Sequence, residues 1–235
     1  PKDIAVVSVM PCTAKKFEAA RPELAGNGVP DVDVVITTRE LARMIKEASI
    51  DFVNLPDEDF DPLMGESTGA GVIFGATGGV MEAALRTVYE VVTGKTLEKV
   101  DFTEVRGIVG VKEATIQVGD IAVNVAVAHS TGNAAKLLDA IRKGEKTYHF
   151  IEVMGCPGGC VTGGGQPIVS AEVRNTCNPS VVRAKALYDE DAAKPSRKSH
   201  ENAELKQMYA EYLGEPNSHR AHELLQTHYH QRNKY

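Results

Sequence analysis

Two segments of this chain place cysteine side chains where they could hold a metal centre. Cys156 and Cys160 have three residues between them and lie in the segment 152–167, which also contains six glycines and two prolines. Glycine allows positive φ and a close approach of the main chain to a bulky ligand, and cysteine thiolates are the usual protein ligands of iron–sulfur clusters. The segment therefore suits a large inorganic cluster. A Gly-rich structural turn with a redox-active CxxxC, or one half of a zinc site, is the alternative interpretation.

A third cysteine, Cys12, lies far upstream in the segment 10–18, whose sequence is MPCTAKKFE. Both cysteine segments follow apolar runs that are typical of strands, Ile4–Val9 and Tyr148–Val153. Together the two segments resemble signature motifs of the iron-only (FeFe) hydrogenases, MPCxxKxxE and ExMxCxxGCxxGGGxP. Every fixed position of both patterns is filled, in the right order. The chain is therefore similar to this family.

The resemblance implies an H-cluster as the cofactor. In the family, four cysteines hold a four-iron–four-sulfur cubane, and one of them bridges to a diiron unit with CO, cyanide and azadithiolate ligands. Matched by motif, Cys12 and Cys156 are ligands of the cubane, and Cys160 is both a ligand and the bridging thiolate. Three cysteines do not complete a cubane in the usual four-cysteine manner. Cys177 lies outside both motifs and is a weak candidate for the fourth ligand.

The resemblance also assigns catalytic roles to Lys15 and Glu18, beside Cys160. An ammonium is a compact cation with three donors, which suits a cyanide nitrogen on an anionic diiron unit. Glu18 follows Lys15 by three positions, a spacing at which a helix brings the two side chains together, so the carboxylate could orient the ammonium. The competing interpretation of Lys15 is a surface lysine beside Lys16.

The remaining residues that the resemblance places beside the cofactor are apolar. Met10 and Met154 each precede a ligand cysteine by two positions, and thioethers suit a pocket that limits water. Pro11 belongs to the first motif, and Phe74 lies in a stretch similar to the family's GAGxIFGxTGG. Ordinary core packing is the alternative for the methionines and Phe74. For the glycines around Phe74 we prefer close helix packing to a phosphate cradle, because no GxGxxG or Walker pattern is present.

The activity that the resemblance implies is the reversible reduction of two protons by two electrons to H₂. Two other functions are compatible with the cluster cysteines. One is a non-catalytic, hydrogenase-like iron–sulfur protein of cluster assembly, and the other is a hydrogen-sensing hydrogenase. Lys15, Glu18 and both methionines favour the enzyme over the assembly protein, because such relatives generally lose the residues of the diiron pocket.

The family's third cysteine motif, similar to TSCCP, is absent from this sequence. In the family it supplies the remaining cubane cysteine and the thiol that passes protons to the diiron unit. We therefore expect an N-terminal half, as a separate chain or as a missing or cleaved part, to pack against this chain through a large apolar interface. A ferredoxin-like or other electron carrier is the expected redox partner.

Composition limits which kinds of partner and which cellular compartment are expected for this chain. The 235 residues include 32 acidic and 26 basic ones, giving a net charge of −6, which argues against a nucleic-acid surface. No apolar run approaches the ~18 residues of a membrane-spanning helix. Three of the four cysteines belong to the motifs, so a reducing, cytoplasmic setting is expected, with a periplasmic one as the alternative.

The pattern of apolar residues predicts an α/β fold in which helices flank a mainly parallel sheet. Strands are expected at Ile4–Val9, Val32–Ile36, Arg106–Val111, Glu113–Val118, Ile121–Val127 and Tyr148–Val153, with the fourth and fifth forming a hairpin. Helices are expected after Thr37 or Thr38, at Val80–Val92 and at Thr131–Lys143, the last ended by Gly144. Ligands of such sheets lie at the carboxyl ends of strands. Both cysteine segments are therefore expected to meet at one edge of one sheet.

The character of the sequence changes after about residue 170. We predict a hydrogenase domain over residues 1–170 and a helical segment over 171–235, with helices near 180–191, 202–213 and 218–227. The segment resembles the separate small subunit of some FeFe hydrogenases. Its last part contains His219, His222, His228 and His230, which suit either a metal site or an exposed polar helix.

Overall fold

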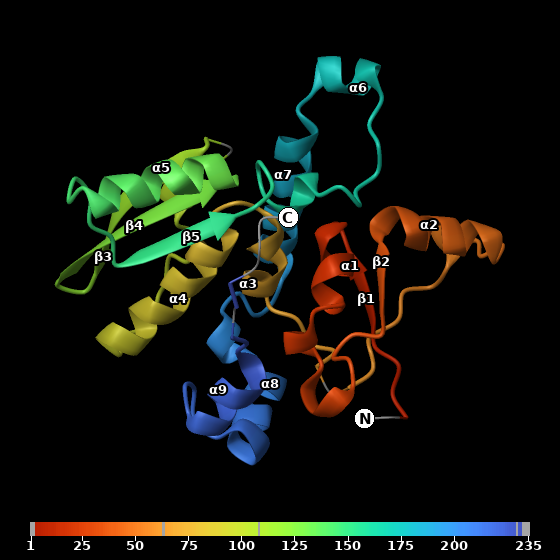
Figure 1. The fold of residues 1–235 in the computed structure, drawn as a ribbon, viewed down its shortest axis with the longest axis horizontal. Coiled ribbons are helices and arrows are strands. Elements are labelled where there is room, and N and C mark those ends of the chain that lie inside the picture. Colours follow the sequence, from red (N-terminus) through yellow and green to blue (C-terminus); the bar gives the residue numbers. More distant parts are fainter. Residues whose placement is uncertain (1–2, 63, 108, 229, 232–235) are drawn as a thin grey trace. The chain divides into compact units, whose positions relative to one another are not determined.

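The computed structural model describes residues 3–62, 64–107, 109–228 and 230–231. The chain divides into two compact units. The first contains residues 1–59, 164–167 and 203–235, and the second contains residues 60–163 and 168–202. Each unit is described by itself below, and Figure 1 labels the elements.

The first unit is built on two parallel strands, β1 (Val7–Met10) and β2 (Val34–Thr37), paired in register from Val7 with Val34 to Met10 with Thr37. Helix α1 (Ala14–Ala19) follows β1, and helix α2 (Thr38–Glu47) follows β2. Short 3₁₀ turns lie at residues 22–24, 26–28 and 52–54. The unit also contains α8 (Ala203–Met208), a π-helical turn at Tyr209–Leu213, and α9 (His219–Leu225).

Helix α2 is capped by Thr37, one of the two threonines predicted for this role, and Glu40 completes a capping box. Thr37 Oγ1 accepts a hydrogen bond from Glu40 N at 3.2 Å, and Glu40 Oε2 accepts one from Thr37 N at 2.7 Å. The Thr37 N–H, the Lys16 ammonium and the Thr37 hydroxyl together lower the pKa of Glu40 to about 2. The box fixes the point at which β2 turns into α2.

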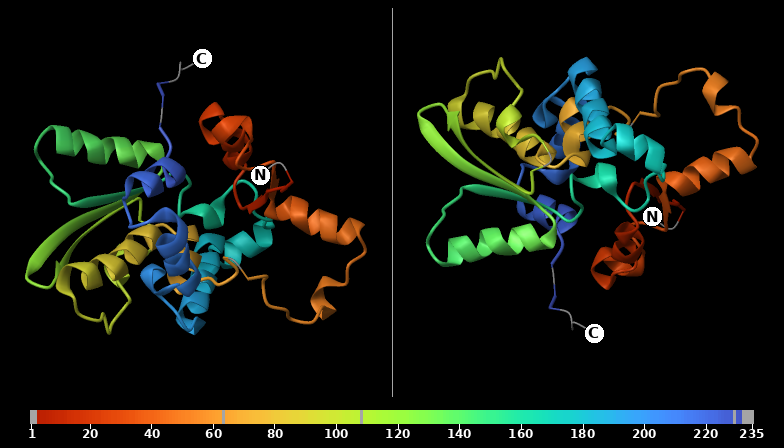
Figure 2. Two further views of the ribbon diagram at one scale, coloured as in Figure 1. Left: turned by 90° about the horizontal axis from the view of Figure 1, so that it is seen from below. Right: turned by 90° about the horizontal axis from the view of Figure 1, so that it is seen from above.

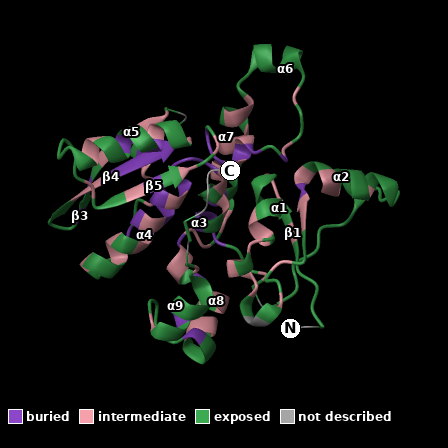
Figure 3. Cartoon of the chain, viewed as in Figure 1, coloured by how far each residue is buried: buried purple, intermediate pink, exposed green. Residues whose placement is uncertain are grey.

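The first strand is not buried on both faces, although a continuous apolar run such as Ile4–Val9 is typical of a strand that is. Val7 is 54% exposed and Val9 is 42% exposed, and Figure 3 colours most of the first unit as exposed or intermediate. The strand begins at Val7 and has only β2 beside it in its sheet. A two-stranded sheet with short helices offers too little apolar surface to bury these side chains.

The second unit contains a three-stranded sheet in the order β3-β4-β5. Strands β3 (Val111–Val118) and β4 (Ile121–His129) form the predicted hairpin, turning through Gly119 at φ 60°. Strand β5 (Phe150–Met154) pairs parallel with β4. The predicted α/β class, with sheets flanked by helices, is confirmed.

Strand β4 buries both of its faces between two helices. Val125 and Val127 join a core with Met81 and Leu85 of helix α4 (Gly79–Thr93), whereas Ala126 and Ala128 pack with Leu137 of helix α5 (Thr131–Arg142). Figure 2 shows the two helices on opposite faces of the sheet. This alternation follows from the two-residue period of a strand.

The remaining helices of the second unit are α3 (Gly69–Val72), α6 (Ala171–Thr176) and α7 (Pro179–Ala193), with 3₁₀ turns at Ile73–Gly75, Thr103–Val105, Cys160–Thr162 and Ser199–Glu201. Most predicted helices are confirmed within a few residues, and α3 and α6 are additional in this unit. The predicted strand at 106–111 is wrong for its described residues before Val111, since Gly107 has φ 102°, which breaks an extended run.

A buried cluster of charges joins α4 to α7. Arg86, Glu82 and Asp191 are inaccessible to solvent. The Arg86 guanidinium contacts both carboxylate oxygens of Asp191, at 2.7 and 2.8 Å, and Glu82 Oε1 at 2.8 Å. Arg106 pairs with Glu82 and Asp101, and Arg197 pairs with Asp101 and Asp191. Burial is the largest single influence on the pKa of Asp191 and raises it, but the hydrogen bonds and charges of the Arg86 and Arg197 guanidinium groups together hold that pKa below its usual range.

No helix among the described residues is long and apolar enough to cross a membrane. The division of the chain into residues 1–170 and 171–235 is based on sequence character and stays a prediction.

We predict that replacing Arg86 by Met lowers the free energy of unfolding by about 3–5 kcal/mol, because it leaves the buried carboxylates of Glu82 and Asp191 without their shared cation. Denaturant titration measures the change. Arg142→Met removes an exposed pair with Asp139 and is the control, with an expected change of about 0–1 kcal/mol. Equal effects of the two substitutions would contradict the prediction.

Candidate metal centre

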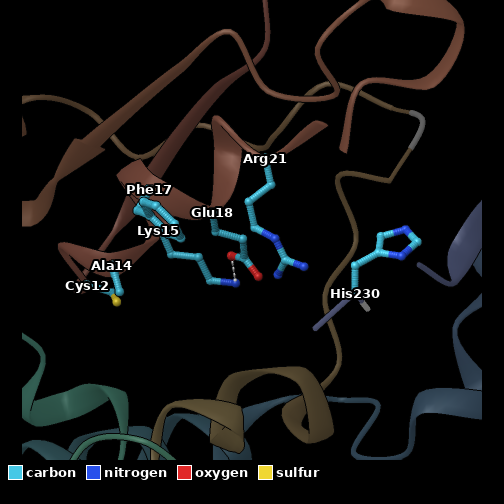
Figure 4. Close-up of a pocket in the computed structure, with 7 residues that line it drawn as sticks. All are labelled: Cys12, Ala14, Lys15, Phe17, Glu18, Arg21 and His230. Carbon is cyan, nitrogen blue, oxygen red and sulfur yellow. Dashed lines mark ion pairs between the residues drawn. The ribbon is translucent and has the colours of Figure 1, made fainter. Parts of the chain in front are cut away.

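Cys12 lies in the turn between β1 and α1, at the carboxyl end of the strand, as predicted. It is half-buried and lines a pocket of 520 Å³. The other lining residues are Ala14, Lys15, Phe17, Glu18, Arg21 and His230. Figure 4 shows the Lys15 and Glu18 side chains extending toward each other in this pocket, with the Cys12 thiol on the same side. His230 was not among the residues that we predicted for this site.

Lys15 and Glu18 form the expected i, i+3 ion pair on α1. The neighbouring Lys16 is used differently, because its ammonium donates to the Val35 carbonyl at 2.8 Å and pairs with Glu40 at 2.9 Å. Lys16 therefore connects α1 to β2 and α2, whereas Lys15 faces the pocket beside Cys12. The structure therefore assigns different contacts to two adjacent lysines that the sequence alone does not distinguish.

The last glycines of the second cysteine segment lie against the first one. Gly165 N donates to the Pro11 carbonyl at 3.0 Å, and Gly165 O accepts from Arg39 N at 3.2 Å. A Cβ at Gly165 would lie 2.8 Å from Thr37 Cβ and 3.0 Å from Met10 O. Only glycine fits this position. The Gly-rich end of the motif therefore packs closely on the end of β1, where half-buried Met10 and Pro11 precede Cys12.

In the second unit, β5 ends at Met154 and is followed by the cysteine loop, residues 155–163. Gly159 N donates to Cys156 O at 3.0 Å, and Gly163 N donates to Cys160 O at 2.9 Å, so each cysteine begins a tight turn. The Cys156 and Cys160 side chains are half-buried. Cys156 thus follows a strand end, as predicted.

The cysteine loop is in direct contact with the Phe74 loop, residues 73–78. Thr77 N donates to Gly158 O at 3.2 Å. Gly159 has φ 103°, and a Cβ there would lie 2.6 Å from Thr77 N and 2.7 Å from Gly75 O. The loop therefore carries Phe74, which is partly exposed, next to the segment with the two cysteines. The glycines serve close packing, the interpretation preferred from the sequence.

Two charged residues behind these loops were given no role from the sequence, although Glu152 fills the first fixed position of the second motif. Glu152 is a charged position inside an apolar strand, and Lys112 is one inside β3; this pattern could have drawn attention to both. The Glu152 carboxylate accepts from Gly78 N and Met81 N, each at 2.7 Å. Burial lowers the pKa of Lys112 to about 8, partly opposed by the charge of Glu152.

The predicted ligands are divided between the units: Cys12 belongs to the first, and Cys156 and Cys160 belong to the second. In the described part of the chain, β1 and β5 lie in two different sheets, so the expectation of one shared sheet is wrong. Convergence of the three thiols on one cluster stays a prediction. Thiolates on tight, glycine-rich turns fit an iron–sulfur group, and the fourth thiolate of the usual set is still needed.

The other candidate ligands do not supply it. Cys177 is exposed and its thiol donates to the Val173 carbonyl at 3.5 Å. Among the described residues, the grouping of donors that could surround a metal is Glu90, His200 and Glu201. The Lys198 ammonium already pairs with both carboxylates, at 2.6 and 3.0 Å, so ion pairing explains that grouping. The C-terminal histidines are not part of it.

Comparison with known proteins places these observations in a family. Residues 1–164 match the model of the iron-only hydrogenase large subunit, C-terminal domain, and residues 180–232 match that of the iron hydrogenase small subunit. The chain is 57% identical over 231 residues to the NADP-reducing hydrogenase subunit HndD of Solidesulfovibrio fructosivorans, covering 98% of this chain and 39% of that protein.

Two further comparisons show the fold and a more distant branch. A solved structure of an [FeFe]-hydrogenase, concerned with oxygen inactivation that is initiated by modification and degradation of the 2Fe subcluster of the H cluster, has 42% identity and a TM-score of 0.77. The match covers 97% of this chain and 62% of that one. The cytosolic Fe-S cluster assembly factor narfl of Xenopus tropicalis is 30% identical, over 98% of this chain and 48% of its own length.

The fold, the Cys12 turn and the cysteine loop thus define an α/β protein of the iron–sulfur class. This chain belongs to the iron-only hydrogenase family, as its sequence motifs predict. It spans about two fifths of the length of the curated hydrogenases that it matches.

We predict that Gly159→Ala lowers the free energy of unfolding by about 2–4 kcal/mol, because the new Cβ meets the backbone of the Phe74 loop and the residue must hold positive φ. Gly155→Ala is the matched control on the same loop, since its Cβ would meet no atom within 4 Å. Thermal or denaturant unfolding of the two variants measures the difference. A Gly159→Ala variant as stable as Gly155→Ala would refute the packing of the two loops.

Proposed function

We propose that this chain is the C-terminal part of the catalytic domain of an [FeFe] hydrogenase, an oxidoreductase that interconverts protons and electrons with H₂. The observation that carries the proposal is the ion pair of Lys15 with Glu18 in a pocket lined by Cys12, within a chain of this family. Similarity at 57% identity to a protein named as a hydrogenase subunit supports it.

The cofactor would be an H-cluster, held through Cys12, Cys156 and Cys160, with Cys160 as the bridging thiolate. When bound, its diiron unit supplies the cleavage and formation of H₂. The protein supplies the surroundings. The Lys15 ammonium would hold a cyanide ligand by a charge-assisted hydrogen bond, and Glu18 keeps that ammonium oriented.

Apolar residues would limit water around the cofactor. Met10 and Pro11 lie at the end of β1, Met154 lies at the end of β5, and Phe74 lies in the loop that contacts the cysteine loop. Thioether and aromatic groups add no charge and accept few hydrogen bonds, so they would lower the local polarity and favour tight interaction of Lys15 with an anion.

An N-terminal half, on the same polypeptide or on another, would complete the site with the fourth cubane cysteine and the proton-relay thiol. The share of the hydrogenase relatives that this chain covers supports this. So does the apolar surface of the first unit, where Ile4, Val7, Val34 and Val53 are exposed. Such a surface is typical of an obligate interface. A ferredoxin-like carrier would exchange electrons, in a reducing compartment such as the cytoplasm.

The cluster-assembly function is the second candidate, supported by the 30% identical relative. It requires the cysteines but not a cation that faces a diiron unit. The Lys15–Glu18 pair favours the hydrogenase. Uptake of a synthetic diiron cofactor separates the two functions, because an assembly protein would not retain it.

We predict that Lys15→Met in the full-length polypeptide leaves the cubane in place but causes loss of the diiron unit. Hydrogen turnover should fall by about 100-fold or more, as expected when a preorganised charge is removed. Iron content and infrared bands of CO and cyanide measure retention. The Lys16 ammonium bonds to Val35 and Glu40 instead of facing the pocket, so Lys16→Met is the control. This variant should keep the diiron unit and normal hydrogen turnover. Full diiron occupancy with normal turnover in Lys15→Met would refute the role of Lys15.

We further predict that residues 1–235 alone do not evolve hydrogen after anaerobic reconstitution with iron and sulfide and addition of a synthetic diiron cofactor, because one cubane thiolate and the relay thiol are missing. Addition of the N-terminal half should restore turnover. Appreciable turnover by the isolated chain would show that the proposed second half is dispensable.

A further inference from the structure

The start of α4 rests on a carboxylate from another element. Glu152 lies on β5 and is only 5% exposed. Its Oε1 accepts from Gly78 N and its Oε2 accepts from Met81 N, both at 2.7 Å. Gly78 is the residue before the first turn of α4 and has φ 94°. The first amide groups of a helix have no partner inside the helix, so Glu152 supplies partners for two of them and complements the helix dipole.

A buried cation holds the same turn from the other side. Lys112, on β3, is 9% exposed, and its ammonium donates to Thr77 O at 3.0 Å and to Gly107 O at 2.8 Å. Thr77 and Gly78 are consecutive, so one peptide segment is held by Lys112 through its carbonyl and by Glu152 through its amide. Both contacts are charge-assisted, and such bonds are about twice as strong as neutral ones.

The held segment is the part of the Phe74 loop that contacts the cysteine loop. Thr77 N donates to Gly158 O, and Gly159 allows no Cβ against Thr77 N and Gly75 O. In the sequence, Glu152 precedes Met154 by two positions and Cys156 by four. Glu152 is thus connected to the cysteine loop twice, along its own strand and through the Phe74 loop.

We propose that Glu152 and Lys112 are positioning residues that set where the Phe74 loop lies against the cysteine loop, and thereby the surroundings of the Cys156 and Cys160 thiolates. The effect on a metal centre rests on the proposed function. The effect on the two loops does not, because it involves only contacts within the second unit. Neither residue touches a reacting group, so both act through the backbone that they hold.

The loop arm of the test uses the metal-free full-length polypeptide and hydrogen exchange. In Glu152→Gln only one side-chain oxygen remains, so one of the two bonded amides, Gly78 N or Met81 N, loses its acceptor. We expect peptides covering 73–81 and 155–163 to exchange about tenfold faster or more. Glu145 is exposed and its side chain forms no hydrogen bond or ion pair with the residues that the structure describes, so Glu145→Gln is the matched control with unchanged exchange. Acceleration confined to 73–81, with 155–163 unchanged, would overturn the coupling of the loops.

Lys112→Met removes the ammonium but keeps the aliphatic part of the side chain and both Glu152 hydrogen bonds. This variant is used in the same experiment if Glu152→Gln does not fold. It should accelerate the same two peptides. Because both residues hold one segment, the double variant should show less than the product of the two single effects. Purely multiplicative effects would show that the two residues act on separate structures and would overturn the proposal.

The metal arm uses the reconstituted full-length protein. We expect Glu152→Gln and Lys112→Met to retain iron and sulfide at the wild-type level, with a shift in the reduction potential of the cubane and in the infrared bands of CO and cyanide. Unchanged potential and bands in both variants would overturn the effect on the thiolates. If the wild-type protein itself takes up no cluster, the proposed function fails, while the exchange arm still decides the positioning role.

Discussion

The second unit depends on one buried guanidinium, that of Arg86. All of its donor groups are used: Nε donates to Val100 O, Nη1 to Asp191 and Arg197 O, and Nη2 to Glu82 and Asp191. A buried charge is tolerated when it is paired and fully hydrogen-bonded, and it is costly otherwise. The contacts join α4, α7 and the two segments near residues 100 and 197. The segment that matches the small-subunit model is therefore attached to the large-subunit part through α4.

Helix α4 connects the Arg86 cluster to the loop that carries Cys156 and Cys160. Its middle is fixed by Arg86, and its first turn is fixed by Glu152 on β5, the strand that ends beside the cysteine loop. The Phe74 loop lies between the helix start and the cysteine loop, without room for a Cβ at Gly159. Because the contacts at the start of α4 and between the two loops are backbone on backbone or charge on backbone, the two thiols are presented by a framework with little side-chain freedom. Such preorganisation is what a metal centre requires.

The first unit is organised differently, since it has little buried apolar surface and is joined mainly by hydrogen bonds and ion pairs. The capping box of Thr37 and Glu40, the bonds of Lys16 to Val35 and Glu40, and the seating of Gly165 on Pro11 keep the Cys12 turn in place. These contacts orient α1, and α1 in turn presents the Lys15–Glu18 pair to the pocket. Valines of β1 and β2 stay exposed in this unit, as Val7 and Val34 show.

The sequence by itself determined the family, the α/β class, the hairpin turning at Gly119, the capped start of α2 and the cysteines that follow strand ends. These features depend on local periodicity, on single capping or turn residues, and on two contiguous motifs, all of which are legible along the chain. Only the tertiary structure decided that Lys16 is structural while Lys15 faces a pocket, that β1 and β5 lie in separate sheets, and that the described residues between 106 and 110 do not form a strand. It alone revealed the bonds of Glu152 and Lys112 to the turn before α4, and those of Arg86 to Asp191. Their partners are 35 to 105 positions away, and pairing between buried charges over such separations depends on how elements pack, which no local pattern records.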